Sequence, residues 1–266
     1  MRQLFLLFLL ISFDAYSQDE QNFYIDELLE RIQYVNNPNS NDILCISEIE
    51  RAKKDIKNGR IVFTQTVGFL FGDIRYESEL RKLCKEYGLV FDFDLISDVI
   101  YEGQTQGCYG DFMDKVIIER YGIGFKENLH EKADSLFLFR TQSENILVKY
   151  WDCDERPRLP KELERTGDYL TTIKVNNLNI VKEKSEFGGW PFFDLGFIIE
   201  KDSTISDFYI SNFVPQLKEN EKFRDDLYKI AVRELKTNYS RWIPGTIKGI
   251  PVKTDNNVRI FFAKEE

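Results

Sequence analysis

The sequence predicts an α+β protein: an N-terminal α/β-type domain with a small sheet, followed by a C-terminal domain of the order β-β-α-β. Three observations support this fold class. Helical and strand periodicities alternate over residues 19–150. Residues 151–165 interrupt the pattern with prolines and charges, which is typical of a linker. Residues 166–266 show strand patterns on both sides of one helical pattern.

The amino-acid composition limits the classes of function that the protein can have. The 266 residues, 42% of them hydrophobic, supply enough apolar material for such cores. With 45 acidic and 36 basic side chains the net charge is -9, so we expect no nucleic-acid partner, which would require a concentrated basic surface. The chain has one histidine, His130, which leaves little room for a histidine-rich zinc site or a Ser-His-Asp triad. Composition therefore favours a non-catalytic binding protein over an enzyme.

The first 17 residues have the pattern of a signal peptide. A basic start precedes the apolar run Leu4–Phe13, and the small residues Ala15 and Ser17 lead to a cleavage site that leaves Gln18 first. The run is shorter than the roughly 20 apolar residues that cross a bilayer, so we expect no membrane span after cleavage. These features predict a periplasmic protein, with outer-membrane association and secretion as the alternatives.

Export alters the interpretation of the cysteines. Four of them are disulfide candidates in an oxidising compartment, with three pairings open: Cys45, Cys84, Cys108 and Cys153. No C-x-x-C element is present, so the spacing does not indicate a zinc ribbon or a thioredoxin motif. Cys84 also fits a small core residue, because it shares a helical face with Leu80 and Leu83.

The N-terminal pattern predicts helices separated by two strands. A first helix lies around Ile25–Ile32, and a capping box at Ser47 predicts a second that ends at Gly59. The strands Ile61–Val67 and Leu89–Leu95 flank a helix over Leu80–Tyr87, which suggests a β-α-β unit. Two further helices are predicted at Met113–Tyr121 and Leu129–Phe137, and a short strand at Asn145–Trp151.

Carboxylates gather near a glycine-rich loop in this half: Asp92, Asp94, Asp98, Glu102, Asp111 and Asp114. Such a cluster could bind a hard cation or divide acid and base roles, and Cys108 could act as a nucleophile with His130 as its base. The spacing fits no phosphate-binding or EF-hand motif, so a solvated sheet edge and a capped helix are favoured. We predict no catalytic, cofactor or metal site. The alternative is an exported enzyme, or a ligand- or cation-binding domain, that uses the Asp92–Asp114 region.

Four segments of the C-terminal half occur in a fixed order. A hairpin is predicted over Leu195–Ile210 with its turn at Ser203, then an amphipathic helix over Phe223–Leu235. A W-x-P-G-x-x-x-G-x-P-V segment and a closing strand follow. The segment's fixed positions are Trp242, Pro244, Gly245, Gly249 and Pro251. Over residues 193–262 this order resembles the C-terminal domain of TonB, the periplasmic end of an energy transducer.

The resemblance implies protein binding at the Gram-negative envelope through a partner strand added to the sheet edge. That edge is expected at the closing strand: Val258, Arg259, Ile260, Phe261 and Phe262. The implied partner is an outer-membrane or periplasmic protein, or another copy of the chain. With only seven prolines the chain lacks the stiff proline-rich linker of a transducer, so we expect a binding module that carries no force.

Overall fold

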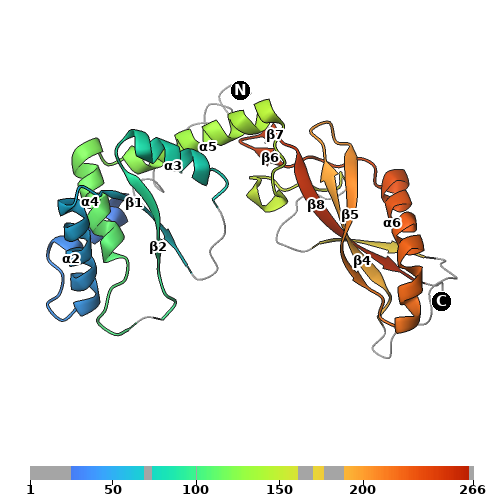
Figure 1. The fold of residues 1–266 in the computed structure, drawn as a ribbon, viewed down its shortest axis with the longest axis horizontal. Helices are drawn as coiled ribbons and strands as arrows, with labels where there is room; N and C mark the ends of the chain where they lie inside the picture. Colours follow the sequence, from blue (N-terminus) through green and yellow to red (C-terminus); the bar gives the residue numbers. More distant parts are fainter. Residues whose placement is uncertain (1–24, 69–73, 100, 161–169, 177–188, 264–266) are drawn as a thin grey trace, which may run out of the picture. The chain divides into compact units, whose positions relative to one another are not determined.

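The structure is a computed structural model that describes residues 25–68, 74–99, 101–160, 170–176 and 189–263. It mixes helices and small sheets, in agreement with the predicted α+β class (Figure 1). Two compact units divide between Phe137 and Leu138. They are called the N-terminal and C-terminal units below. The predicted signal peptide, residues 1–17, lies outside the described residues.

The N-terminal unit contains the predicted β-α-β segment. Strands β1 (Val62–Val67) and β2 (Val90–Leu95) pair in parallel, and helix α3 (Glu77–Glu86) connects them. A parallel pair requires a crossover, which α3 supplies. The positive φ of Gly88, 70°, lets the chain turn from the end of α3 into β2.

Helices surround this sheet: one over residues 25–36, α2 (Ile43–Lys57), α4 (Cys108–Tyr121) and α5 (Phe125–Glu144). The predicted start of α2 at Ser47 is wrong. Asp42 caps the helix instead, its Oδ1 accepting from the backbone N–H of Cys45 at 3.1 Å. Ser47 lies inside the helix, where its hydroxyl donates to the Leu44 carbonyl at 2.8 Å. The helix ends at Lys57, shortly before the predicted stop at Gly59.

One disulfide ties two of these helices together. Cys45 on α2 is bonded to Cys108 at the start of α4, and both are fully buried beside Val35 and Ile49. The structure thus forms one disulfide, where the sequence left open three ways of joining the four cysteines in two. Cys84 is a free thiol in the core of the N-terminal unit, as its helical spacing indicated, and burial raises its pKa to about 12. Cys153 is buried in the C-terminal unit, and its thiol donates to the Lys149 carbonyl at 3.8 Å.

The division between the units differs from the predicted linker at 151–165. It falls within α5, and the described part of the linker region belongs to the C-terminal unit. Glu155 forms a bridge with Thr246, Arg158 forms another with Ile243, and Leu159 is buried in the core of that unit. The predicted strand at Asn145–Trp151 is reduced to one bridge, between Val148 and Thr254.

In its described residues, the C-terminal unit contains a four-stranded sheet with a helix packed against it (Figure 1). The strands are β3 (Thr171–Val175), β4 (Phe192–Ile199), β5 (Ile205–Val214) and β8 (Thr254–Phe262), in the spatial order β3-β8-β4-β5. Helix α6 (Arg224–Asn238) follows β5. Alternate residues of the strands and one face of α6 form the core, which includes Phe193, Phe197, Leu227, Ile260 and Phe262.

The predicted hairpin of β4 and β5 is present and antiparallel. Its turn places Ser203 at a φ of 74°, a conformation that usually favours glycine. On the open face of the sheet the ring of Tyr209 lies directly over Gly196. A Cβ at position 196 would be 2.2 Å from Cζ of Tyr209, so any larger residue there would require the ring to move.

The segment that follows α6 closes the core. Trp242 is 1% exposed, packs against Phe197 with ring centroids 5.2 Å apart, and donates its indole N–H to the Tyr239 carbonyl. Strands β6 (Thr246–Ile247) and β7 (Ile250–Pro251) then form a small hairpin. Its two turn residues, Lys248 and Gly249, both have positive φ, as in a type I′ turn.

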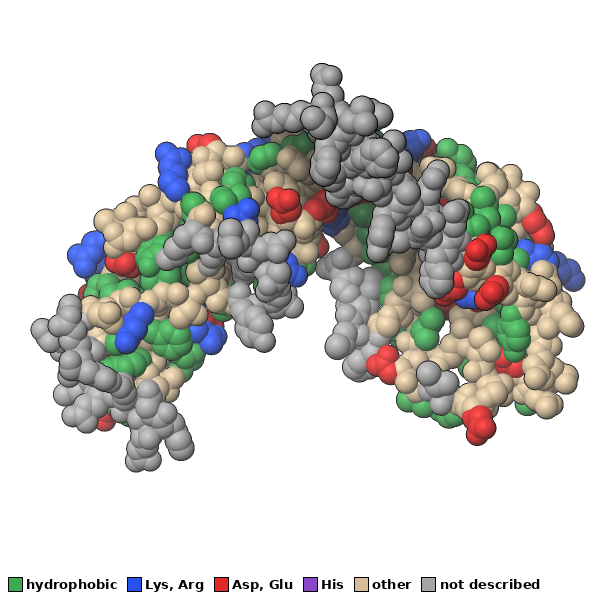
Figure 2. Space-filling model, turned by 180° about the vertical axis from the view of Figure 1, so that it is seen from behind, with side chains coloured by type: hydrophobic (Ala, Val, Ile, Leu, Met, Phe, Trp, Pro, Cys, Tyr) green, Lys and Arg blue, Asp and Glu red, His purple; other side chains and the backbone are tan. Residues whose placement is uncertain are grey.

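Surface charge is mixed. On the face shown in Figure 2, the basic side chains of the described residues are scattered among acidic and apolar ones. Within the described ranges, no helix has the length and apolar character needed to cross a membrane.

Candidate functional site

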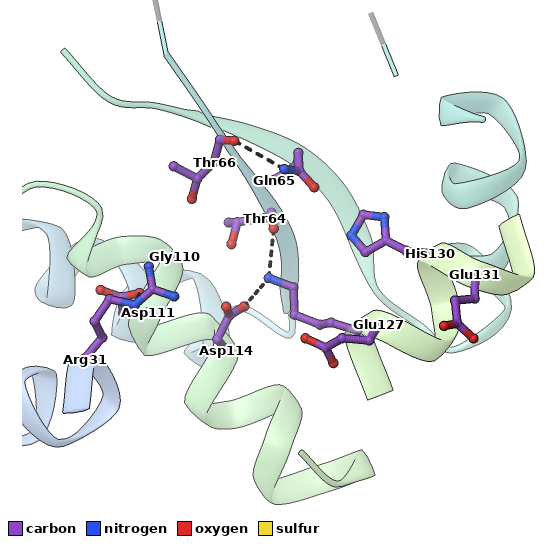
Figure 3. A pocket seen from close by; sticks show the side chains of 11 residues that line it. Arg31, Thr64, Gln65, Thr66, Gly110, Asp111, Asp114, Glu127, His130 and Glu131 are labelled. Atoms are coloured by element: carbon purple, nitrogen blue, oxygen red, sulfur yellow. Dashed lines mark hydrogen bonds and ion pairs between the residues drawn. The ribbon is translucent and has the colours of Figure 1, made fainter. Parts of the chain in front are cut away.

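A polar pocket of about 480 Å³ opens in the N-terminal unit (Figure 3). Four elements contribute to it: the helix over residues 25–36, β1, α4 and α5. The lining residues are Arg31, Thr64, Gln65, Thr66, Gly110, Asp111, Asp114, Lys126, Glu127, His130 and Glu131. Its volume is in the range of pockets that hold small molecules.

Helix α4 lies close to the sheet because residue 110 is glycine. A Cβ at Gly110 would lie 3.0 Å from Oδ2 of Asp94 and 3.1 Å from Oγ1 of Thr64. At the start of α4, the carboxylate of Glu48 accepts from the backbone N–H of Tyr109 at 3.2 Å and so caps the helix from another element. The Asp94 carboxylate also lies close to Gly110, and its Oδ2 is buried without a hydrogen-bond partner.

Lys126 forms the centre of the pocket. Its ammonium donates to the Thr64 carbonyl at 2.9 Å and to Oδ1 of Asp114 at 2.7 Å. It also lies 4.9 Å from the ring centroid of Phe63. Figure 3 shows both hydrogen bonds crossing from α5 to β1 and α4. The ammonium group is therefore fixed by three contacts.

His130 lines the same pocket from α5. Its ring packs edge-on to Phe63 at 5.3 Å, and its Nδ1 lies 3.3 Å from the Tyr76 hydroxyl. Burial, with a further contribution from the charge of Lys126, lowers the pKa of His130 to about 4. The imidazole is therefore neutral at pH 7.

Asp111 and Arg31 form a loose ion pair at one side of the pocket. Their closest atoms, Oδ1 and Nε, are 3.7 Å apart, and the Asp111 side chain is only 13% exposed. Burial raises the pKa of Asp111 to about 6; Arg31 opposes this shift, and Asp114 adds to it. The Arg31 Nε is buried without a hydrogen-bond partner.

The structure brings together only part of the carboxylate cluster considered from the sequence. Asp111 and Asp114 line the pocket with His130, and Asp94 lies beside Gly110. Asp92 instead bonds Arg60, at 3.2 Å. Asp98 and Glu102 are exposed and do not line the pocket.

The Cys108–His130 pairing considered as nucleophile and base is wrong for this structure, because the Cys108 sulfur is bonded to Cys45. The histidine is also a weak base, since its pKa is lowered. Sequence reasoning missed the two cations, Arg31 and Lys126, which lie on other helices than Asp111 and Asp114. Among the described residues, no group of three or more His, Cys, Asp or Glu side chains could hold a metal ion.

The second candidate site is the predicted sheet edge at Val258–Phe262, and here the prediction needs correction. β8 is not an edge strand, because β3 pairs with it in parallel from Thr171↔Val258 to Val175↔Phe262. Along β8, the side chains of Val258, Ile260 and Phe262 are fully buried. The edge that the sequence predicted is thus occupied by a strand of the same chain.

Comparisons with protein families, with curated proteins and with solved structures find no match for this chain. Its function is therefore inferred from its residues and their geometry.

Proposed function

We propose that the chain is an exported, non-catalytic protein-interaction module of the Gram-negative envelope, which binds an extended partner segment along β8. Export is inferred from residues 1–17 and envelope function from the resemblance over residues 193–262. The chain order β4, β5, α6, β8, with Trp242 buried against Phe197, supports that resemblance.

The observation that carries the proposal is the pairing of β3 with β8. Within the described residues, β3 and β8 form the only parallel pair of this sheet; β4 pairs antiparallel with both of its neighbours. β8 is held by β4 over eight residue pairs and by β3 over five. β8 therefore has a secure partner on one side and accepts an added strand on the other.

β3 is attached weakly enough to be replaced. Of its five side chains only Ile173 is buried, at 2% exposure. Burying this isoleucine contributes about 1.5–3 kcal/mol. Val175 adds a partly buried contact with the same core, and the rest of the attachment is the backbone ladder with β8, which a partner strand would also form. A partner segment with an apolar residue at the position of Ile173 would form the same ladder. We infer that β3 fills the binding edge until such a partner replaces it.

A labelled peptide of residues 170–176 tests this by fluorescence anisotropy. The Ile173→Asp variant places a charge in the core and should release β3, so it should bind the peptide at least tenfold more tightly than the wild type. Thr172→Asp is the matched control, since it adds the same charge at an exposed position of the same strand. Equal binding by the wild type and Ile173→Asp, or no binding to either, would contradict the proposal. Urea unfolding of each variant checks that it is folded.

Export is tested separately. Expression of the full chain in a Gram-negative host should give a periplasmic protein whose N-terminal sequence begins at Gln18. A chain that keeps Met1 and stays in the cytoplasm would contradict the envelope location.

A further inference from the structure

One aromatic ring lies flat on the open face of the C-terminal sheet, the face away from α6. Gly196 on β4 is the direct partner of Tyr209 on β5. A Cβ at Gly196 would be 2.2, 2.4 and 2.7 Å from Cζ, Cε2 and Cε1 of the Tyr209 ring. Such similar distances to three ring atoms place that Cβ over the face of the ring and not at its edge. One face of the ring therefore rests on the β4 backbone.

The outer face of the ring is open to solvent. Tyr209 is 44% exposed, although Gly196 lies directly beneath it. A glycine in a strand often marks a place where another group approaches the backbone closely, and here it lets the ring lie parallel to the sheet. A ring that is held in place loses little conformational freedom when a ligand binds. The sheet therefore presents a fixed, flat aromatic surface.

Neutral hydrogen-bonding side chains lie beside this ring. Asn257 on β8 is the other direct partner of Gly196, and its Oδ1 accepts from the Ser211 hydroxyl at 2.7 Å, across β4. Amide and hydroxyl groups can both donate and accept hydrogen bonds. Burial, together with the charge of Asp255, raises the pKa of Tyr209, so its hydroxyl also stays protonated and neutral at pH 7. Neutral donors and acceptors thus surround an apolar ring face.

We propose that this face of the sheet binds a neutral saccharide, with one sugar ring stacked on Tyr209 and its hydroxyl groups bonded to Ser211 and Asn257. The C–H groups on the flat side of a glucose-type ring carry a small positive charge, which complements the negative face of an aromatic ring. Sugar hydroxyls both donate and accept, as the two side chains do. The site lies on the face of the sheet, so it does not depend on the exchange of β3 at the edge.

Charged ligands fit this surface poorly. Arg259 is the next residue on the same face of β8, and its guanidinium donates to the two carboxylate oxygens of Asp194 at 2.7 and 2.9 Å. It also lies 4.4 Å from the ring centroid of Phe192. The guanidinium is therefore engaged, and the Asp255 carboxylate near Tyr209 would repel a phosphate group. A nucleotide would gain the stacking contact but lose free energy through its charge.

Isothermal titration calorimetry with cellotetraose and with triacetylchitotriose tests the proposal. The wild type should bind at least one of these sugars at millimolar concentration. Tyr209→Ala should weaken binding at least tenfold, whereas Tyr209→Phe keeps the ring and should retain most of the affinity. Tyr101→Ala is the matched control, because it removes a tyrosine that is 63% exposed in the N-terminal unit, and it should bind like the wild type.

Asn257→Ala gives a second test that leaves the ring in place. It should weaken sugar binding severalfold, and urea unfolding checks that each variant is folded. Adenosine monophosphate and a hexaproline peptide should not compete with the sugar. No binding of either sugar, equal binding by Tyr209→Ala and Tyr101→Ala, or displacement by the nucleotide or the peptide would overturn the proposal. Binding of the residue 170–176 peptide should be unchanged in Tyr209→Ala, so the two proposals can fail separately.

Discussion

Ile173 on β3 is the direct partner of Ile260 on β8, and both side chains are buried in the core of the C-terminal unit. The contact joins a strand that makes few other buried contacts to one that runs through the centre of the sheet. The edge that the sequence predicted as a partner site is therefore covered by β3, a short segment of the same chain, which we propose that a partner strand replaces.

The close contact of Gly196 with the ring of Tyr209 predicts strong coupling between the two positions. Gly196→Ala should destabilise the protein by about 1–3 kcal/mol, because the new Cβ would overlap the ring. In a Tyr209→Ala background the same substitution should cost little. Urea unfolding of the two single variants and the double variant measures the coupling. Additive effects would show that the ring does not lie over residue 196.

The Cys45–Cys108 disulfide should stabilise the N-terminal unit. It closes a loop with a sequence separation of 63, and loop-closure entropy gives about 4 kcal/mol for that length. The Cys45→Ala/Cys108→Ala variant should unfold at correspondingly lower urea concentration, followed through the N-terminal unit. Cys84→Ala, which alters a free buried thiol, is the control and should cost much less. Peptide mapping that finds four free thiols in exported protein would rule out the bond.

The single histidine allows a direct test of the pocket's environment. The pKa of His130 is lowered from 6.5 to about 4, so its folded form favours the neutral ring. The resulting stability is present above pH 6.5 and is lost as the pH falls from there towards 4, on the order of 3 kcal/mol. One imidazole signal should therefore titrate near pH 4 in an NMR experiment. His130→Gln should lose less stability than the wild type over that pH range. A titration near 6.5 would mean that the ring is exposed to water.

Local signals in the sequence predicted most helices and strands, but not their partners. The β-α-β order and the β4–β5 hairpin follow from periodicity and turns, and the structure confirms both pairings. The pairing of β3 with β8 could not be predicted from periodicity and turns. The alternation of Thr171–Val175 is a strand pattern, yet strand pairing depends on contacts between segments far apart in the chain. The cap of α2 was misplaced because Asp42 and Ser47 both fit the N-cap preference.

Local sequence signals also failed to predict which side chains meet in the pocket. Asp111, Asp114 and His130 were noted in the sequence as candidates, but no spacing connects them with Arg31 or Lys126. The cations reach the pocket only because three helices pack around one strand end. Lys126 stands next to Glu127 on an amphipathic helix, a pattern that also describes many solvent-facing helices.

The central claim is that a partner strand replaces β3 beside β8. A reversible disulfide that joins β3 to β8 tests this claim most directly. Thr172 and Arg259 are direct partners on the two strands. In an Ile173→Ala background, which loosens β3, the pair Thr172→Cys/Arg259→Cys should form a disulfide, and Arg259→Cys alone controls for loss of the ion pair with Asp194. The binding of the residue 170–176 peptide is then measured before and after mild reduction. The account predicts at least tenfold weaker binding when the strands are locked, and recovery on reduction. Equal binding by the locked and reduced forms would contradict it.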